Sequence, residues 1–426
     1  MKAEKLLAVA ILWVLLAVSC KQDPIFFIIA TETAPIKPRI EGAPTNMVVF
    51  QRDYPDPSPG DPDKTKKVPI LYVASGRLHW YAKERRGAGE SRWDSSEYAI
   101  PQPGGKIISL AAAGDRLYVL SLNGHGVSTT LRYIESGGNE WKTVRCEAAD
   151  YPLIQSIYAD PQTARLFAGA SKNDRSRATY GILYMDNSDD TNDDYPLRLL
   201  RGDTSIFSGV VYRQEEDTYY LCTRGDGIFS AREINLARGN TPSVSQLTKN
   251  NDNTFMGIIK LNDDQSTVIA VARNGGALYR VQNGSLEQIS GPGENNWIST
   301  GKYTTGALAL WEDYLDPGKK LLIAGIQGGL YSTAISSYSH GYVEFDLFPD
   351  GGLNVNNPRH DPGKLRSVHD NDRYTASIGK HPINHLFQVP KEIDPKMTFF
   401  ASTQTAGLWS YRDRPRNGGW QWNAEE

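Results

Sequence analysis

The strongest constraint on the fold is a short block of sequence that recurs seven times along the chain. The full block contains an alternating apolar strand, a Gly-containing turn and a second strand that begins with an apolar and an aromatic residue, and the copies at residues 73–80, 181–184 and 130–133 are weaker. The copies occupy residues 73–80, 130–133, 181–184, 221–230, 271–280, 323–332 and 401–410. Self-similarity at a fixed period indicates a repeat architecture, in which neighbouring units bury a continuous core.

The spacing of the copies predicts the type of repeat. The apolar residue after each turn serves as an anchor, which gives Leu78, Leu131, Leu183, Ile228, Leu278, Leu330 and Leu408. Five of the six gaps between anchors are 45 to 53 residues long, and the last is 78 residues. A period near 50 with strand patterns throughout is typical of propeller blades, whereas solenoid helices need a 3.6-residue period. We therefore predict an all-β fold over residues 45–426, a seven-bladed β-propeller with four-stranded blades.

Each unit also contains an earlier apolar strand, such as residues 107–112, 154–158 or 255–259. These strands are expected to be innermost, around the central axis. The recurring aromatic residues are expected to fill the wedge between neighbouring blades, since they are present in most units and do not mark one ligand site. Residues 25–30 are a candidate for the strand that closes the ring in the blade of Leu408, which would protect sheet edges.

Charge and cysteine content narrow the function classes. The chain has 46 Lys and Arg against 49 Asp and Glu, a formal net charge of −3. This balance argues against a nucleic-acid partner, because phosphate neutralisation needs a basic excess. With three Cys residues, a disulfide framework is not the main source of stability. Cys146 and Cys222 lie in different units and are expected to be two separately buried thiols, although the sequence leaves their pairing open.

The N-terminus has the pattern of a secretory signal. A lysine-bearing start precedes an apolar run over residues 6–18, and a small residue precedes Cys20. This run is too short to span a bilayer comfortably. We predict a signal peptide over residues 1–19, followed over residues 20–44 by a tether that begins with the polar residues 21–24 and contains the possible closing strand.

The end of this segment, Leu16-Ala17-Val18-Ser19-Cys20, resembles the lipobox of bacterial lipoproteins. Ala17 stands where Leu is commonest, a variation that spirochaetal lipoproteins tolerate. The resemblance implies that Cys20 becomes the lipidated first residue, carrying acyl chains such as palmitate that hold the protein on a membrane. The resemblance also implies an outer-membrane location, because an Asp directly after the Cys tends to retain such lipoproteins at the inner membrane and this position is Lys21 here. The alternative is an ordinary signal peptide that contains a Cys.

Some third strands are followed by a Gly-rich turn and a Trp. The best example is Ser136-Gly137-Gly138-Asn139-Glu140-Trp141, with weaker examples at residues 87–93 and 417–420. These turns resemble those of the Asp-box (sialidase-like) class of propeller, with Ser136 at the Asp position. Sialidases also use an Arg-Ile-Pro motif, and here Arg39-Ile40-Glu41 lacks the Pro. The resemblance therefore supports the fold more than an activity, and a glycoside hydrolase is the weaker alternative.

Two Arg-Gly-Asp tripeptides are candidates for binding a host integrin. The first, Arg201, Gly202 and Asp203, is expected to lie exposed between units. The second, residues 224–226, lies in the Gly-rich hairpin turn of the repeat, where the sequence Asp-Gly favours a tight turn. We take Arg201, Gly202 and Asp203 as candidate partner-binding residues, against the alternative that both tripeptides are chance occurrences.

The long last gap predicts an inserted rim loop over residues 336–380, the leading candidate for a partner-contact element. His360 and His369 lie in it and are the other candidate partner-binding residues. Three further His residues, His340, His381 and His385, lie within or beside it and are expected to be solvated loop residues. Residues 53–67 are expected to form a second exposed loop.

No metal or cofactor is expected. The acidic run over residues 186–194 lacks the central Gly and closing Glu of an EF-hand, and Pro382 disfavours a zinc helix at His381 and His385. The expected role is a non-catalytic binding or scaffolding module, held to a membrane by its lipid anchor and bound to protein partners of the cell envelope or a host surface. The alternatives are a surface adhesin and a sialidase-like glycoside hydrolase.

Overall fold

The structure is a computed structural model of the 426-residue chain. It describes residue 40 and residues 44–55, 65–81, 93, 100–124, 128–160, 162–172, 179–185, 196–236, 242–247, 254–261, 268–272, 278–282, 284–290, 303–312, 314, 320–327, 342–346, 383–395, 398–404, 407–414 and 419–425.

The first four sheets of the described part contain strands β1 to β15. The first sheet has β1 (Met47–Pro55), β2 (Thr65–Ser75) and β3 (Arg77–Tyr81). The second has β4 (Lys106–Ala113), β5 (Arg116–Asn123), β6 (Ser128–Glu135) and β7 (Lys142–Thr143). The third has β8 (Leu153–Ala159), β9 (Leu166–Ser171), β10 (Tyr180–Met185) and β11 (Leu197–Thr204). The fourth has β12 (Phe207–Arg213), β13 (Thr218–Thr223), β14 (Ile228–Arg232) and β15 (Ser245–Gln246).

Three more sheets follow. The fifth has β16 (Phe255–Lys260), β17 (Val268–Ala272), β18 (Leu278–Gln282) and β19 (Ser285–Ser290). The sixth has β20 (Tyr303–Glu312), β21 (Lys320–Gln327) and β22 (Tyr342–Asp346). The seventh has β23 (Ile383–Gln388), β24 (Phe399–Thr403), β25 (Leu408–Arg414) and β26 (Gly419–Ala424). The short helices η2 (Gln214–Glu216) and α3 (Glu233–Leu236) flank strands of the fourth sheet.

Every sheet is an antiparallel meander, in which each strand pairs with the next one along the chain. Six of the seven sequence anchors lie in the third strand of their sheet, and all six are buried: Leu78, Leu131, Leu183, Ile228, Leu278 and Leu408. Leu330 lies outside the described residues. Gly76, Gly227 and Gly407 sit just before the third strand with positive φ, a conformation that favours Gly. The predicted repeat is therefore confirmed as a structural unit.

The core is divided among the spaces between the sheets. Seven clusters of buried apolar side chains each join two successive sheets, and one of them joins the last sheet to the first. Tyr219 and Tyr220 illustrate the arrangement, because successive side chains of a strand point to opposite faces. Tyr219 packs toward the third sheet and Tyr220 toward the fifth. The predicted aromatic filling between sheets is confirmed at these positions.

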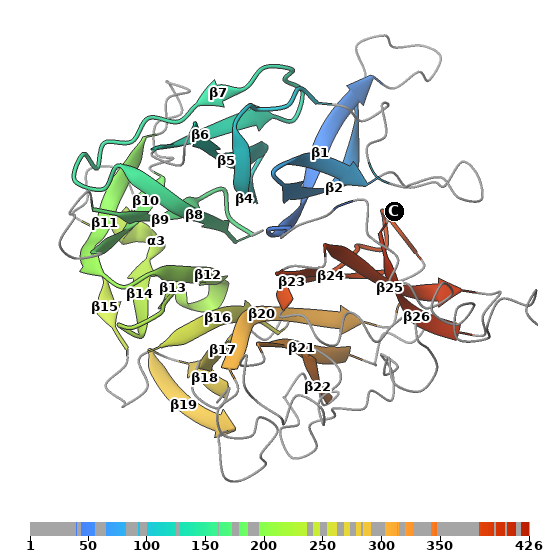
Figure 1. Cartoon of the computed structure of the whole chain (residues 1–426). Helices are drawn as coiled ribbons and strands as arrows, with labels where there is room; N and C mark the ends of the chain where they lie inside the picture. The colour runs from blue at the N-terminus through green and yellow to red at the C-terminus, as the bar shows by residue number, and fades with distance from the viewer. Residues whose placement is uncertain are drawn as a thin grey trace, which may run out of the picture.

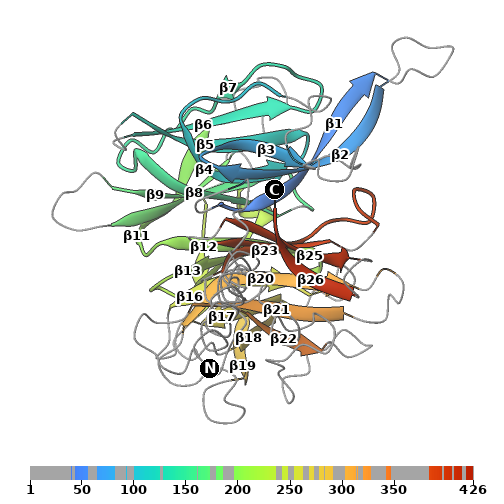
Figure 2. The ribbon, with the colours of Figure 1, turned by 45° about the vertical axis from the view of Figure 1, so that its right-hand side comes forward.

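The sheets form a ring (Figure 1). The first strand of each sheet contacts the first strand of the next, and β23 contacts β1. The view in Figure 2 shows β23 and β25 facing the first sheet. Ile40 accepts a main-chain hydrogen bond from Leu408 (3.1 Å), which places the chain just before β1 against the seventh sheet.

Three predicted segments either differ from the structure or lie outside the described residues. The outer strand of the sheet that contains Leu408 is β26, so this sheet has four strands without residues 25–30, which lie outside the described residues. The hairpin of β1 and β2 is longer than expected and pairs Pro55 with Thr65, so the predicted loop over residues 53–67 is wrong at both ends. Strand β22 pairs with β21 inside the predicted rim loop, which is therefore wrong for those five residues.

Helices contribute little to the described part of the chain. The helix α3 has four residues and η2 has three. Among the described residues, no helix combines the length and apolar character needed to cross a bilayer.

Candidate functional site

Polar side chains connect the first strands at five of the seven joins between successive sheets. We define the inner belt as Asn46, Ser109, Ser156, Ser208 and His385, each of which hydrogen-bonds to the main chain of a neighbouring first strand. Asn46 bonds to both the N–H and the carbonyl of Leu110, and Ser109 does the same at Ile157. Ser156 donates to Phe207 O (3.5 Å), and Ser208 donates to Phe255 O (3.0 Å).

The inner belt coincides with a repeated irregularity in the sheets. In six sheets the pairing of the first strand with the second shifts near its start, for example between Ile107 and Ser109 and between Ile154 and Ser156. A bulge of this kind bends a strand and redirects its side chains. The belt residues Ser109, Ser156, Ser208 and His385 lie at or beside these shifts, so the bulges turn them toward the next sheet.

His385 closes the belt between the last and first sheets. Its Nδ1 accepts a hydrogen bond from the Met47 N–H (3.3 Å), which requires the neutral ring. Burial lowers the pKa of His385 from 6.5 to about 4. His385 therefore lies in strand β23 as a bonded neutral base, and its prediction as a solvated loop residue is wrong.

The same seam contains two buried carboxylates. Asp394 accepts hydrogen bonds from the hydroxyls of Tyr81 (3.1 Å) and Thr398 (2.7 Å). Glu425 accepts a hydrogen bond from the indole of Trp93 (2.9 Å). Because the bonds from Tyr81 and Trp93 cross from the first sheet to the seventh, polar side chains as well as apolar packing close the ring.

The first Arg-Gly-Asp tripeptide lies in β11, the outer strand of the third sheet, and not between units as expected. Arg201 and Asp203 are exposed, and the pairing of β11 with β10 is irregular on both sides of Arg201. Asp203 adopts a φ of +54°, which is uncommon for a residue other than Gly. These irregularities make β11 a distorted outer edge.

Packing against Tyr151 accounts for Gly202 and Asp203. A Cβ on Gly202 would lie 2.6 Å from the Tyr151 hydroxyl oxygen, so the site has no room for another side chain. The same hydroxyl accepts the Asp203 N–H (2.9 Å) and donates to its carboxylate (3.3 Å). Lys172 Nζ lies 3.6 Å from that carboxylate. The tripeptide is thus an integral part of the sheet, with the Asp203 side chain held in place.

The second tripeptide forms the turn before β14. The Asp226 carboxylate accepts a hydrogen bond from the Ser205 hydroxyl (2.7 Å) and also one from the Ser205 N–H. Gly225 has a φ of +155° and lies against Ser205, where a Cβ would clash. The expected turn role is confirmed for this copy.

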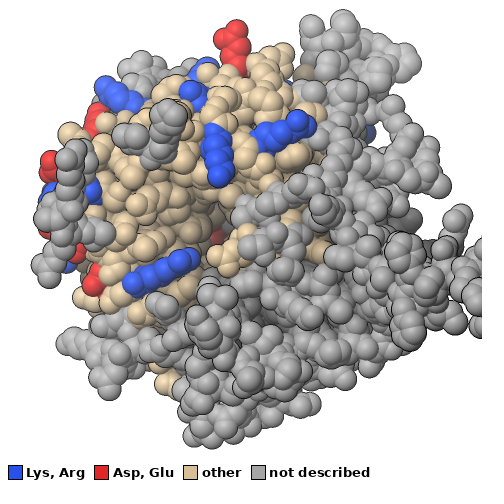
Figure 3. Space-filling model, in the orientation of Figure 1, with Lys and Arg blue, Asp and Glu red and all other residues tan. Residues whose placement is uncertain are grey.

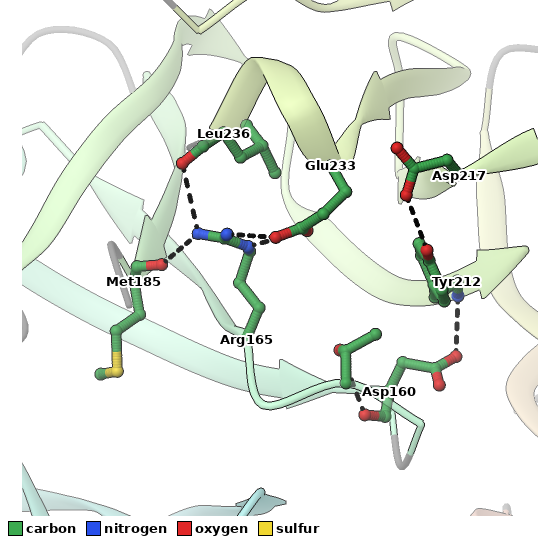
Figure 4. Close-up of polar contacts among 8 residues, drawn as sticks. Asp160, Arg165, Met185, Tyr212, Asp217, Glu233 and Leu236 are labelled. Carbon is green, nitrogen blue, oxygen red and sulfur yellow. Dashed lines mark hydrogen bonds and ion pairs between the residues drawn. The ribbon is translucent and has the colours of Figure 1, made fainter. Parts of the chain in front are cut away.

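An ion pair between the buried Arg165 and the partly exposed Glu233 joins the third sheet to the fourth. Figure 4 shows the Arg165 guanidinium between the Glu233 carboxylate and the main-chain oxygens of Met185 and Leu236. Arg165 Nε donates to Glu233 (3.1 Å), a second bond comes from Nη2, and Nη1 donates to Met185 O (2.7 Å). Each nitrogen of this guanidinium is therefore bonded within the protein.

Figure 4 shows two further contacts, of which the one between Asp160 and Tyr212 joins the same two sheets. The buried Asp160 accepts a hydrogen bond from the Tyr212 N–H (2.7 Å), and the Tyr212 hydroxyl donates to Asp217 (2.7 Å). Burial and the Asp217 carboxylate raise the pKa of Tyr212 to about 12. The phenol is thus a hydrogen-bond donor at neutral pH.

The Tyr219 hydroxyl also hydrogen-bonds to the Glu233 carboxylate. Burial alone would raise the pKa of Glu233, but hydrogen bonds from Arg165 and Tyr219 outweigh it and lower the pKa. Burial, together with Glu233, raises the pKa of Tyr219. Arg165, Tyr219 and Glu233 thus form a clamp between sheets. Sequence analysis missed it because the contact crosses two units.

The predicted Gly-rich turn at residues 136–139 binds the first sheet. Arg52 of β1 is buried and donates to the carbonyls of Glu135 (3.0 Å) and Gly138 (2.7 Å). Ser136 donates to the Asp53 carboxylate. The residue at the Asp position of the turn therefore serves to attach the β1–β2 hairpin to the second sheet.

The remaining predicted sites divide into two groups. Cys146 is exposed and Cys222 is buried, and both thiols are free, which confirms the absence of a bridge between them and corrects the predicted burial of Cys146. Burial raises the pKa of Cys222 to about 12. Cys20, His360 and His369 lie outside the described residues. The acidic run at residues 186–194 and Lys21, which favours an outer-membrane location, lie outside them as well.

The face of the molecule in Figure 3 shows Lys, Arg, Asp and Glu side chains scattered over the described surface, without a large patch of one sign. The described residues contain no group of three or more His, Cys, Asp or Glu side chains arranged to hold a metal ion.

We compared this chain with family models, curated proteins and solved structures, and the matches concern its fold. No family model matches the chain, and no curated protein matches it. Among solved structures, an ancestral GH74 enzyme is similar over 92% of this chain and 48% of its own, with 13% identity and a TM-score of 0.52. This chain thus spans about half the length of that enzyme. A structure described as YCF48 bound to D1 peptide is 12% identical over 89% of this chain and 95% of its own, with a TM-score of 0.46.

The ring of antiparallel sheets and the likeness to the GH74 enzyme define the class. The chain is a nearly all-β protein with a β-propeller fold, as the repeat predicts. At 13% identity this likeness shows the fold alone.

Proposed function

We propose that the protein is a seven-bladed β-propeller lipoprotein that serves as a binding or scaffolding module in the cell envelope. The observation that carries the proposal is the set of seven core clusters, each between two successive sheets, with the seventh between the last and the first. A ring closed by packing on every side holds its outer strands and turns in fixed positions. Such a rigid scaffold suits recognition by the loops it carries.

The same clusters support the proposed number of blades. We take each of the seven sheets as one blade; five have four strands and two have three in the described part of the chain. In the first sheet, Trp93 forms an isolated bridge with Tyr81 on the outer side of β3, where a fourth strand would lie. We infer four-stranded blades throughout, as the sequence predicts.

The membrane anchor rests on Cys20 and the lipobox-like residues before it. Metabolic labelling with a palmitate analogue tests it: we expect label on the wild-type protein and none on Cys20→Ser. Labelling of the Cys20→Ser variant would contradict the anchor. Separation of inner and outer membranes then tests the proposed outer-membrane location.

The binding role is tested on intact cells by cross-linking and purification under denaturing conditions, combined with protease accessibility. We expect a reproducible envelope protein to be cross-linked to the propeller at stoichiometric yield. Recovery of the propeller alone, at cross-linker concentrations that trap known envelope complexes, would contradict the proposal.

Two alternatives remain open to direct tests. Adhesion through Arg201, Gly202 and Asp203 predicts that Arg201→Ala weakens attachment to an integrin-coated surface. The likeness to a GH74 enzyme motivates an assay with fluorogenic glycosides. Turnover of such a substrate would replace the non-catalytic role with hydrolysis.

A further inference from the structure

The inner part of β2 has partners on both sides, but its outer part has only one. Strand β3 pairs with Leu71 to Ser75 and ends at Tyr81. Strand β1 continues beside β2 as far as Pro55, opposite Thr65. Residues 66–70 of β2 therefore form an edge that no strand covers in the described part of the chain. An uncovered edge presents main-chain N–H and carbonyl groups to which another strand can pair.

A cavity lies along this edge. It has a volume of about 280 Å3 and is lined by all five residues of the edge together with Tyr81, Glu392 and Ile393. Val68 and Pro69 are partly exposed, whereas Ile70, Tyr81 and Ile393 are buried. The cavity thus combines an unpaired strand with apolar side chains, the arrangement that strand addition uses for affinity and specificity.

The charges at the edge select the kind of strand. Lys66 and Lys67 are exposed and have no ion-pair partner among the described residues. Asp53 lies opposite Lys67 on β1, but its carboxylate accepts a hydrogen bond from Ser136. Glu392 lies on the facing wall and is exposed. An incoming strand with acidic residues opposite the two Lys side chains would therefore be favoured, since opposite charges across strands attract.

We propose that residues 66–70 of β2 bind an extended acidic segment of a partner protein by strand addition. This inference rests on the proposed binding function and assigns it a surface. The partner strand runs antiparallel to β2, with its backbone on the free edge, its apolar side chains toward Ile70 and Ile393, and two successive carboxylates opposite Lys67 and Lys66.

Fluorescence anisotropy with a labelled peptide tests the proposal. The probe is acetyl-Val-Thr-Val-Glu-Glu-Thr-amide, whose two Glu residues fall opposite Lys67 and Lys66 in antiparallel register. The control peptide has Arg in place of both Glu residues. We expect the full-length protein to bind the Glu peptide at least about tenfold more tightly than the Arg peptide, and this preference to fall as salt is added.

Two changes separate strand addition from charge attraction alone. The double variant Lys66→Glu and Lys67→Glu should reverse the preference between the two peptides, whereas Lys106→Glu, an exposed Lys at the start of β4, should leave it unchanged. Methylation of alternate backbone nitrogens of the Glu peptide should abolish binding, because it removes the main-chain donors. Equal binding of the methylated peptide, or no binding of either peptide, would overturn the proposal. In the second case Lys and Pro at this edge would serve only to prevent pairing.

Failure of strand addition at β2 can be distinguished from failure of the proposed binding function. A partner cross-linked equally well by wild type and by the Lys66→Glu and Lys67→Glu variant would support the binding function and overturn its assignment to β2. If wild type cross-links no partner, the proposed function fails, and the peptide measurement still decides whether the edge accepts a strand.

Discussion

Hydroxyl groups of two buried Tyr residues in the first sheet have different environments. The Tyr72 hydroxyl has no hydrogen-bond partner among the residues that the structure describes, and burial raises the pKa of this phenol. The Tyr81 hydroxyl donates to Asp394 across the seam. A buried polar group without a partner opposes folding, whereas a satisfied one supports it.

Substitution of the two residues by Phe should therefore have different effects. Tyr72→Phe should leave the free energy of unfolding unchanged or raise it by up to about 1 kcal/mol, while Tyr81→Phe should lower it by about 1–2 kcal/mol. Urea unfolding of both variants at neutral pH measures the difference. An equal loss in both variants would mean that the Tyr72 hydroxyl is bonded, for example to ordered water.

The Arg165 clamp can be compared with a surface ion pair. Arg165→Met leaves the Glu233 carboxylate and two carbonyls without their donor, and should cost about 2–3 kcal/mol, below the value for a fully buried pair because Glu233 is partly exposed. Lys142 pairs with Glu135 at the surface (3.0 Å), so Lys142→Met should cost less than about 1 kcal/mol. Similar losses in the two variants would contradict the assignment of Arg165 as the more important clamp.

Only some of these side-chain contacts could be predicted from the sequence. Arg165 and Arg116 both stand at the start of the second strand of a sheet, and both lie near a Tyr ring of the third strand. That similarity can be seen in the sequence. The partner Glu233 cannot, because it belongs to the next sheet, and its position depends on how the two sheets pack.

Strand β11 shows how one element determines the meaning of a motif. The sequence motif Arg201-Gly202-Asp203 suggests an exposed recognition loop, but the strand fits Gly202 and Asp203 against Tyr151. Its Gly is therefore required by packing whether or not a partner binds.

Gly202→Ala tests this interpretation. Because a Cβ would lie 2.6 Å from the Tyr151 oxygen, the variant should lose about 1–3 kcal/mol of stability. Gly138→Ala is the control, since a Cβ there would lie 3.6 Å from its nearest neighbours, an ordinary contact. Thermal unfolding of the two variants distinguishes the roles, and an unchanged midpoint for Gly202→Ala would favour a Gly retained for recognition.

For the strands, the sequence predicted positions along the chain better than lengths. Six of the seven third strands were found, because a buried apolar anchor recurs in each of them. The ends of β1 and β2 were missed because Lys and Pro are poor strand formers, and pairing with the neighbouring strand overrides that preference. Strand β22 was missed because it follows its partner β21 at a longer distance than the other repeats allow.

Ring closure is a property of the whole molecule. The sequence offered residues 25–30 for it, which lie outside the described residues. Among the described residues, side chains of the last sheet and its connections, His385, Asp394 and Glu425, bond directly to the first sheet. Contacts between residues more than 300 positions apart have no local signature. They follow only once the number of sheets and the size of the ring are known.

The His385 bond makes this closure dependent on pH. Since the folded-state pKa of about 4 lies below the ordinary value of 6.5, the unfolded chain takes up a proton more readily between these values. The contribution of His385 to stability is thus full above pH 6.5 and decreases as the pH falls toward 4. His385→Gln keeps an acceptor for the Met47 N–H without titrating.

Urea midpoints of wild type and His385→Gln from pH 7.5 to 4.5 measure this contribution. We expect wild type to lose stability relative to His385→Gln as the pH is lowered, with Asp and Glu titration common to both proteins. A constant difference across the range would show that the protonation of His385 is not linked to folding.

The central claim is that seven packed sheets close into one ring through direct contact of the first and last. A crystal structure of the protein carrying Cys20→Ser, which cannot be acylated at that residue, tests it most directly. The account predicts seven sheets around a single axis, with His385 bonded to the main chain of Met47. A different number of sheets, or a ring open between β23 and β1, would contradict it.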